Sequence, residues 1–109
     1  MTMRESQIEK YLKIKAVALG FEIRKVAWVG RKSAPDRVLF VKARPLTKTS
    51  IDCAWCNPKG RTIWIELKAP GKAPRPDQLR EHARMRAAGQ DVRVIDSIEG
   101  VDALMRELA

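Results

Sequence analysis

The segment Thr62-Ile63-Trp64-Ile65-Glu66-Leu67-Lys68 alternates between apolar residues and the tryptophan, glutamate and lysine. Successive side chains of a β-strand point to opposite faces of a sheet, so this pattern predicts a strand whose isoleucines and leucine share one face. The same period of two places Glu66 and Lys68 together on the other face. These two side chains are the first candidates for a chemical site.

A second acid stands where another strand is expected to begin. Asp36 follows Ala34 and Pro35 and precedes a run rich in valine, leucine and phenylalanine, residues 37–41, which favours a strand. Two adjacent strand ends would hold Asp36, Glu66 and Lys68 around one point. Pro-Asp alone usually marks a turn, and a Glu-x-Lys pair alone is common on a polar strand face, so only their combination indicates a site.

Outward from these strands, the sequence predicts an α/β fold in which a mixed sheet is flanked by helices. The first helix has an apolar stripe of Ile8, Leu12, Ala16 and Leu19 and ends before Gly20. The order α-β-β-β-α-β-α favours a meander of three strands followed by a parallel pair with a right-handed crossover. The expected elements are a helix at 4–19, strands at 21–29, 37–42 and 61–68, a helix at 76–88, a strand at 92–95 and a helix from Asp96 or Ser97 to 108, with a basic turn at 30–35, a loop or protruding hairpin at 44–60 and an irregular stretch at 69–76.

The chain is strongly basic. Its 109 residues indicate one domain, 1–109, and 22 Lys and Arg against 13 Asp and Glu give a formal net charge of +9. Such a balance indicates a polyanionic partner, above all nucleic acid. Because there is no apolar run long enough to span a bilayer, no signal peptide and no basic amphipathic helix, we expect no membrane partner. We expect a cytoplasmic protein with no small-molecule substrate.

Two cysteines, Cys53 and Cys56, form a Cys-x-x-Cys motif. As a zinc site it supplies two ligands, and the single histidine, His82, does not complete four without an acid or a partner chain. As a redox pair it lacks the usual βαβ context. We favour two reduced thiols in a polar loop over both, and a zinc bridge between two copies stays open.

The two acids and the lysine meet the requirements of phosphodiester hydrolysis. A divalent cation neutralises charge on the phosphate and activates a bound water. Mg²⁺ prefers oxygen ligands, which Asp36, Glu66 and the carbonyl of Leu67 would supply. Lys68 would bring a positive charge beside the water and the phosphate. Basic loops lie on both sides of the site, and their candidate DNA-binding residues are Arg31, Lys32, Lys72 and Arg75.

Two further polar residues are candidates for the same site. A helical step of 100° places Glu5 within the apolar stripe of the first helix and Glu9 at its margin. Glu5 is a third acid for the site or, with equal weight, a first-turn acid that complements the helix dipole. Gln78, in the first turn of the second long helix, would hydrogen-bond the attacking water or a phosphate, or else is a surface residue.

Three motifs together resemble the VRR-NUC domain, the virus-type replication and repair nuclease, a branch of the PD-(D/E)xK superfamily. They are Gly30-Arg31-Lys32-Ser33-Ala34-Pro35-Asp36-Arg37, then Glu66-Leu67-Lys68-Ala69-Pro70-Gly71-Lys72, and then Gln78. The resemblance runs from about residue 5 to 95 and implies a restriction-endonuclease-like α-β-β-β-α-β core. The cysteine-bearing stretch at 44–60 lies outside the family pattern.

The resemblance also implies site roles and a substrate. It makes Asp36 and Glu66 metal ligands, Lys68 catalytic, Gln78 a supporting site residue and Glu5 the acid of the first helix. Stand-alone members of the family look phage-derived and are similar to Holliday-junction resolvases, which act as two-fold dimers. We therefore expect an Mg²⁺- or Mn²⁺-dependent endonuclease, a homodimer that cleaves branched DNA in repair; a less selective nuclease stays open.

Two other classes of protein compete with this interpretation. One is a non-catalytic DNA-binding module, against which the intact acid-acid-lysine set argues. The other is a small RNA-binding or assembly protein, which predicts exposed aromatic pairs for stacking on bases. Of the tryptophans, Trp28 and Trp64 are expected within strands, in the core or an interface, and Trp55 is the candidate for exposure.

Overall fold

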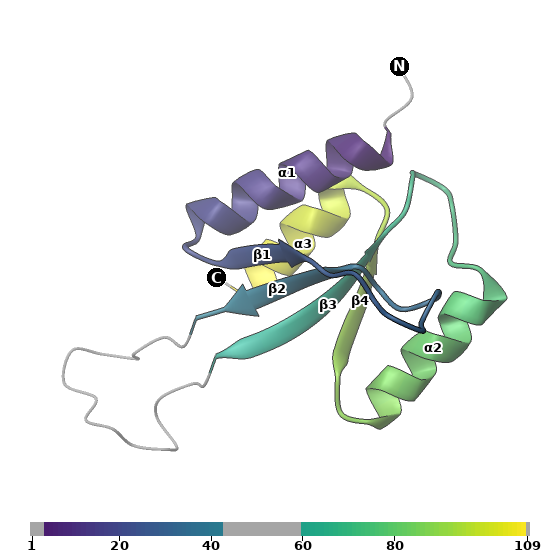
Figure 1. Ribbon diagram of the computed structural model, residues 1–109. Coiled ribbons are helices and arrows are strands. Elements are labelled where there is room, and N and C mark those ends of the chain that lie inside the picture. Colours follow the sequence, from purple (N-terminus) through teal and green to yellow (C-terminus); the bar gives the residue numbers. More distant parts are fainter. Residues whose placement is uncertain (1–3, 43–59, 109) are drawn as a thin grey trace, which may run out of the picture.

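A four-stranded mixed sheet forms the centre of the computed structural model, which describes residues 4–42 and 60–108 (Figure 1). The strands lie in sequence order across the sheet. The first two pairs are antiparallel and the third is parallel, so the expected meander and the parallel final pair are confirmed. The strands are β1 (Glu22–Lys25), β2 (Arg37–Val41), β3 (Arg61–Leu67) and β4 (Asp91–Ile95).

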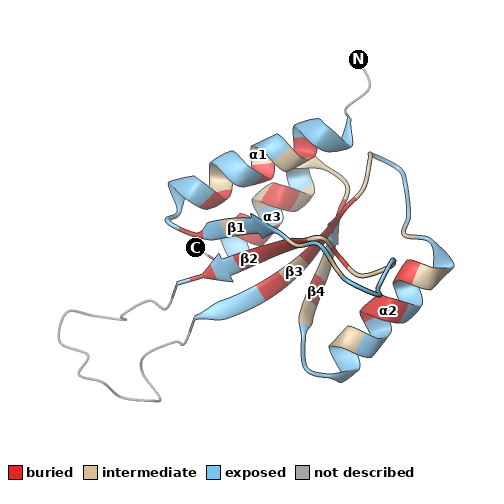
Figure 2. Ribbon diagram, in the orientation of Figure 1, coloured by how far each residue is buried: buried red, intermediate tan, exposed pale blue. Residues whose placement is uncertain are grey.

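Helices cover both faces of the sheet. α1 (Glu5–Ala18) and α3 (Ile98–Leu108) pack against each other on one face, and α2 (Pro76–Ala87) lies over the other (Figure 1). The alternating isoleucines and leucine of β3 belong to the core. Figure 2 shows buried residues along β2 and β3 and on α1 and α3. The core is built from Ile8, Leu12, Ala16, Phe21, Leu39, Val41, Ile63, Ile65, Leu67, Ile95, Val101, Leu104, Met105 and Leu108.

The apolar stripe of α1 ends at Ala16, not at Leu19 as expected. Ile8, Leu12 and Ala16 are fully buried, but Leu19 is 41% exposed, so its assignment to the stripe was wrong. The helix terminates at Leu19 and Gly20, whose φ of +79° turns the chain back, and the N–H of Phe21 donates to the carbonyl of Ala16. This C-cap inserts Phe21 into the core in place of Leu19.

The first strand is shorter than its sequence pattern suggests. β1 ends at Lys25, and Trp28 lies outside any strand, contrary to our expectation. The N–H of Val26 still donates to the carbonyl of Asp36, but the last paired residues are Lys25 and Arg37. Pairing ends there because β2 begins at Arg37, so the apolar residues beyond Lys25 have no partner strand.

The helix that follows β4 is capped by a serine. The Oγ of Ser97 accepts the N–H of Gly100, which decides between Asp96 and Ser97 in favour of the serine. No helix in the part of the chain that the structure describes is both long and apolar enough to cross a membrane. Cys53, Cys56, Trp55 and most of the expected 44–60 loop lie outside the described residues.

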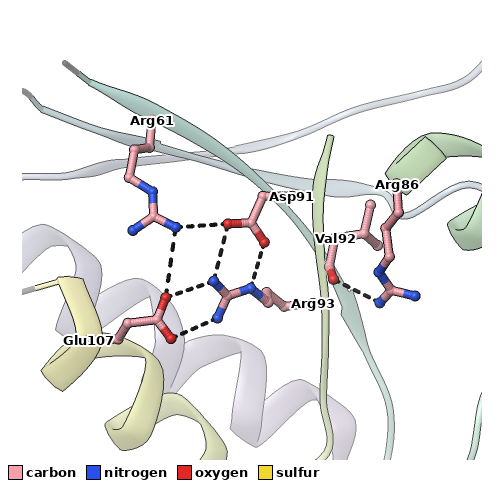
Figure 3. A network of polar contacts seen from close by, with 6 residues as sticks. All are labelled: Arg61, Arg86, Asp91, Val92, Arg93 and Glu107. Atoms are coloured by element: carbon pink, nitrogen blue, oxygen red, sulfur yellow. Dashed lines mark hydrogen bonds and ion pairs between the residues drawn. The ribbon is translucent and has the colours of Figure 1, made fainter. Parts of the chain in front are cut away.

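A network of charged side chains ties β3, β4 and α3 together on the side of the sheet away from α2 (Figure 3). Arg93 contacts Asp91 through Nε and Nη2, at 2.5 and 3.1 Å, and Glu107 through both Nη atoms, at 3.0 and 2.7 Å. Arg61 adds a 2.9 Å contact to Asp91. These paired contacts raise the pKa of Arg93 and lower the pKa values of Asp91 and Glu107. The network links β3, which carries Glu66, to β4 and α3.

Candidate active site

The two acids of the sequence motif face each other across two adjacent strand ends. β2 and β3 are antiparallel, with Arg37 opposite Ile65. One step further along the same register, Asp36 lies opposite Glu66 at the start of β2 and the end of β3. The structure therefore brings together the two carboxylates that the sequence placed on separate strands.

The carboxylate of Glu66 is buried and only partly satisfied. The residue is 8% exposed, and its Oε1 accepts no hydrogen bond from the described residues. The Nζ of Lys68 lies 3.9 Å from Oε2. The Nε2 of His82 lies 3.4 Å from Oε1, but the two atoms are not aligned for a hydrogen bond. A buried acceptor without a donor is rare in proteins and indicates a place for a further ligand.

The surroundings of Glu66 shift its protonation. Burial raises the pKa of Glu66 from 4.5 to about 7. The ammonium of Lys68 opposes that rise, the negative charges of Asp36 and Glu5 add to it, and the guanidinium of Arg75 opposes it. All four side chains therefore act electrostatically on the same carboxylate, which makes Glu66 the centre of the cluster.

The two acids of α1 have different partners. Glu5 is exposed in the first turn of the helix and contributes to the negative potential at Glu66. Glu9 instead accepts a 2.5 Å hydrogen bond from the Nη2 of Arg37, a buried residue whose Nη1 lies 3.3 Å from the Oδ2 of Asp36. Glu9 is thus engaged in holding Arg37, and Glu5 is the α1 acid left to act on the site.

The buried face of α2 is polar: it consists of Gln78, Glu81 and His82. The Oε1 of Gln78 accepts the N–H of Arg75 at 3.0 Å, so the amide caps the helix as well as lying inside the protein. It is buried, which contradicts the alternative of a surface residue. Its contact with water or phosphate stays a prediction.

His82 is a residue of this site that the sequence analysis did not assign to it. Its ring is fully buried, and neither nitrogen has a hydrogen-bond partner among the described residues. Burial, with the nearby charges of Arg86 and Lys68, lowers the pKa of His82, and Glu81 opposes this only weakly. The spacing of four residues from Gln78 was the available signal, because it places both side chains on one face of a helix.

The basic loop before Asp36 is tied to α2 by two polar contacts. The Oγ of Ser33 donates to the Oδ2 of Asp77 at 2.5 Å, and the Nη1 of Arg31 lies 3.3 Å from the Oε1 of Glu81. Hydrogen bonds from Ser33 and Arg75 lower the pKa of Asp77 to about 2. The loop is therefore held in place next to the site that it borders.

The four candidate DNA-binding residues differ in whether their side chains form ion pairs. Arg31 contacts Glu81, and the Nε of Arg75 lies 3.2 Å from the Oδ1 of Asp77. Lys32 and Lys72 are exposed, and neither side chain forms an ion pair within residues 4–42 and 60–108. The two lysines are thus the freer charges beside the site.

The donor atoms fit a divalent cation. The Oε1 of Glu66, which has no hydrogen-bond partner in the part of the chain that the structure describes, belongs to a carboxylate close to that of Asp36, and carboxylates are the ligands that hard cations prefer. Within the described ranges, no three His, Cys, Asp or Glu side chains are grouped so as to hold a metal by themselves. This leaves a set of one or two carboxylates completed by backbone oxygen and water, which is typical of Mg²⁺.

The arrangement of the elements is that of a restriction-endonuclease-like nuclease fold. No protein-family model matches the chain. The protein named "Putative nuclease p44" from Acyrthosiphon pisum secondary endosymbiont phage 1 is 38% identical over 95 residues, which cover 87% of this chain and 85% of that protein. Among solved structures, a VRR_NUC domain matches with a TM-score of 0.70 and 30% identity and covers 96% of this chain and 97% of its own. The chain belongs to the VRR-NUC family of nucleases, which confirms the expected fold and family.

Proposed function

We propose that this chain is an endonuclease that hydrolyses phosphodiester bonds of DNA with Mg²⁺ or Mn²⁺ as its cofactor. The observation that carries the proposal is the Glu66 carboxylate, which is buried beside Asp36 and Lys68 and has one oxygen without a hydrogen-bond partner among the described residues. A fold built only to bind DNA has no use for two adjacent carboxylates, since they repel the phosphate backbone. We propose that residues 1–109 act as one nuclease domain.

Each member of the cluster has a separate role in this proposal. Asp36, Glu66 and the carbonyl of Leu67 would hold the cation, which supplies Lewis-acid stabilisation of the phosphate and activates water. Lys68 keeps a positive charge beside the carboxylates, where it stabilises the negative charge that develops on the phosphate. Glu5 adds negative potential that favours cation binding, and Gln78 supplies an amide that orients the water or a phosphate oxygen.

The substrate and the assembly extend the proposal. The net charge of +9 supports a polyanionic substrate, and the exposed Lys32 and Lys72 flank the site on two loops. We propose that the chain works in the cytoplasm as a homodimer on branched DNA such as Holliday junctions, in phage or host DNA repair. Two sites related by a two-fold axis would cut two strands of such a junction symmetrically.

A cleavage assay tests the proposal directly. The purified chain is incubated with linear, forked and four-way DNA in the presence of Mg²⁺, Mn²⁺ or a chelator. We expect cleavage that requires the cation and is strongest on branched DNA. Asp36→Asn should abolish cleavage and weaken Mn²⁺ binding in calorimetry, whereas Lys68→Ala should abolish cleavage but keep the cation. Cleavage that continues in the chelator or in Asp36→Asn would refute the assignment.

A second candidate function, a DNA-binding module without activity, predicts a different outcome. Such a protein would bind the same DNA with the same salt dependence but would leave every substrate intact with either cation. The assay above separates the two functions, because binding and cleavage are measured on one preparation.

A further inference from the structure

A groove whose lining includes two tryptophans and two arginines lies next to the candidate active site. Its volume is about 290 Å³, close to the ~300 Å³ lower end of small-ligand sites. The groove lies between α2, β3 and the segment that follows β1, and its lining includes Trp28, Trp64, Arg31, Arg84, Glu81 and Gln90. Trp64 precedes Glu66 by two residues and shares its face of β3, so the groove adjoins the buried carboxylate.

The two tryptophans pack against each other in the lining of the groove. Their ring centroids are 5.2 Å apart with an interplanar angle of 46°, and both residues are half-buried rather than part of the core. The Nε1 of Trp28 donates to the carbonyl of Pro35 at 2.7 Å, and that of Trp64 donates to the Oε1 of Gln90 at 3.1 Å. Because their N–H groups are already engaged, the surface that they add to the groove is aromatic carbon.

The rim of the groove is positively charged. Arg31 and Arg84 contact one carboxylate, that of Glu81, at 3.3 and 2.9 Å. Their side chains are 56% and 60% exposed, and two cations against one anion leave a net positive rim. A second copy of this chain, also with a net charge of +9, is poorly matched to such a rim, whereas a nucleic acid is well matched.

We propose that this groove binds an unpaired nucleobase of the DNA strand whose backbone lies at the candidate active site. The inference rests on the proposed nuclease function and specifies its substrate. Stacking on aromatic rings tolerates every base, because each base has a π-face, and the arginines attract the flanking phosphates. A base inside a duplex is already stacked and paired, so the groove favours single strands and the open bases at a branch point.

The test measures binding without cleavage. Trp55→Phe removes the third indole, so that fluorescence reports Trp28 and Trp64 alone, and a chelator prevents cleavage. We expect an oligothymidylate strand to quench this emission and a duplex of equal length to quench it much less. Trp28→Leu, on the Trp55→Phe background, should weaken oligothymidylate binding roughly five- to 150-fold, the loss of one stacked base, with an unchanged salt slope.

Two matched substitutions of neighbouring alanines control for a loss of folding. Ala88 lines the groove, and Ala87 is its exposed neighbour outside it. Ala88→Glu should weaken single-strand binding more than Ala87→Glu, although both add the same charge at the same helix end. Equal effects of the two variants, or quenching by duplex as strong as by single strand, would overturn the inference. So would a wild-type dimer that Ala88→Glu dissociates in sedimentation, since the groove would then be a subunit interface.

The same measurements separate this inference from the proposed function. If the chain cleaves DNA but oligothymidylate does not quench Trp28 and Trp64, the base-binding groove is wrong and the nuclease stands. If oligothymidylate quenches the emission but no substrate is cleaved with either cation, the groove binds bases in a protein that is not a nuclease.

Discussion

Glu66 is a residue whose burial disfavours its charged form. It is a buried acid with one oxygen that has no hydrogen-bond partner among residues 4–42 and 60–108. The negative charges of Asp36 and Glu5 disfavour its ionised form, and the positive charges of Lys68 and Arg75 favour it. Burying a carboxylate costs stability unless it is paired, so a protein that retains such a group has placed it where a ligand can compensate. Glu66 stays buried because it lies near the end of β3 and the buried His82 of α2 packs against its carboxylate.

Removing the charge of Glu66 should stabilise the protein when no cation is present. In a chelator at pH 8, Glu66→Gln should raise the melting temperature by about 4–8 °C, which corresponds to about 1 kcal/mol in a domain of this size. Glu81→Gln is the matched control, because Glu81 is equally buried but is paired with Arg31 and Arg84, and it should lower the melting temperature. A melting temperature that falls in both variants would show that Glu66 is satisfied within the protein.

The two acids of α1 should separate activity from stability. Glu5→Gln should reduce cleavage with little change in melting temperature, because Glu5 is exposed and acts on Glu66 through its charge. Glu9→Gln should cost about 1 kcal/mol of stability, because it weakens a hydrogen bond to the buried guanidinium of Arg37. Thermal unfolding and cleavage rates measured on both variants test this, and the reverse ranking in either would place Glu9 in the site.

At this scale the sequence predicts some residues and misses others for identifiable reasons. The period of two along β3 suffices to bring Glu66 and Lys68 to one face, and the antiparallel register adds Asp36. His82 was missed because the buried face of α2 is polar, so no apolar stripe shows which side of the helix turns inward. The spacing of four residues from Gln78 was the signal that His82 lies on the same helix face.

At the scale of elements, the position of α2 depends on its contacts with the loop before β2. Ser33 and Arg31 on the loop contact Asp77 and Glu81 on the helix. The sequence predicted both segments but not this contact, because hydrogen bonds between distant loops and helices leave no periodic pattern. The sequence also predicted too late an end for β1. Val26 and Trp28 continue the apolar pattern of the strand, but β1 pairs with β2 only as far as Lys25 opposite Arg37.

The contact between Ser33 and Asp77 should make α2 docking sensitive to acid. The folded-state pKa of Asp77 is lowered to about 2 from an ordinary 3.8, so this contact stabilises the fold above about pH 4 and is lost as the pH falls through about 2. Ser33→Ala should therefore lower the melting temperature near neutral pH, and the difference from wild type should shrink toward pH 2. Thermal unfolding across that range measures it.

Ser97→Ala provides the control for this pH dependence. Ser97 caps α3 by accepting a backbone N–H, so its loss should cost about 1 kcal/mol. No carboxylate takes part in that contact, and the cost should be the same at pH 4 and pH 2. A Ser33→Ala difference that is as constant as that of Ser97→Ala would mean that the charge of Asp77 does not matter to docking.

At the scale of the whole molecule, the sheet separates two functions of the surface. The face beneath α1 and α3 carries the core and, at its edge, the closed charge network of Arg61, Asp91, Arg93 and Glu107 (Figure 3). The face that α2 covers carries Glu66 and the groove. Lys32 and Lys72 stand on the loops that lead into β2 and α2, and neither forms an ion pair with the described residues. The charges of the network are thus paired within the fold, whereas Lys32 and Lys72 remain free beside the site where DNA is proposed to bind.

This division predicts which charges contribute to the salt dependence of DNA binding. Each phosphate that the protein neutralises adds about −0.9 to the slope of log K against log[salt] for duplex DNA. Lys72 is exposed, unpaired among the described residues and next to the site, so Lys72→Ala should make the slope shallower by about one unit without changing Mn²⁺ binding. Arg75→Ala should act in the same direction but less, because Arg75 is already paired with Asp77.

Arg106→Ala is the control that removes the same charge from the opposite face. Arg106 is exposed in the last turn of α3, away from α2, so its loss should leave the slope unchanged. If the chain is a two-fold dimer, Lys72→Ala removes two contacts, and the change on a four-way junction should approach twice that on a single duplex arm. Equal slopes for the Lys72 and Arg106 variants would place the DNA away from the loops that border Asp36 and Glu66, and the substrate would then have no path to the acids.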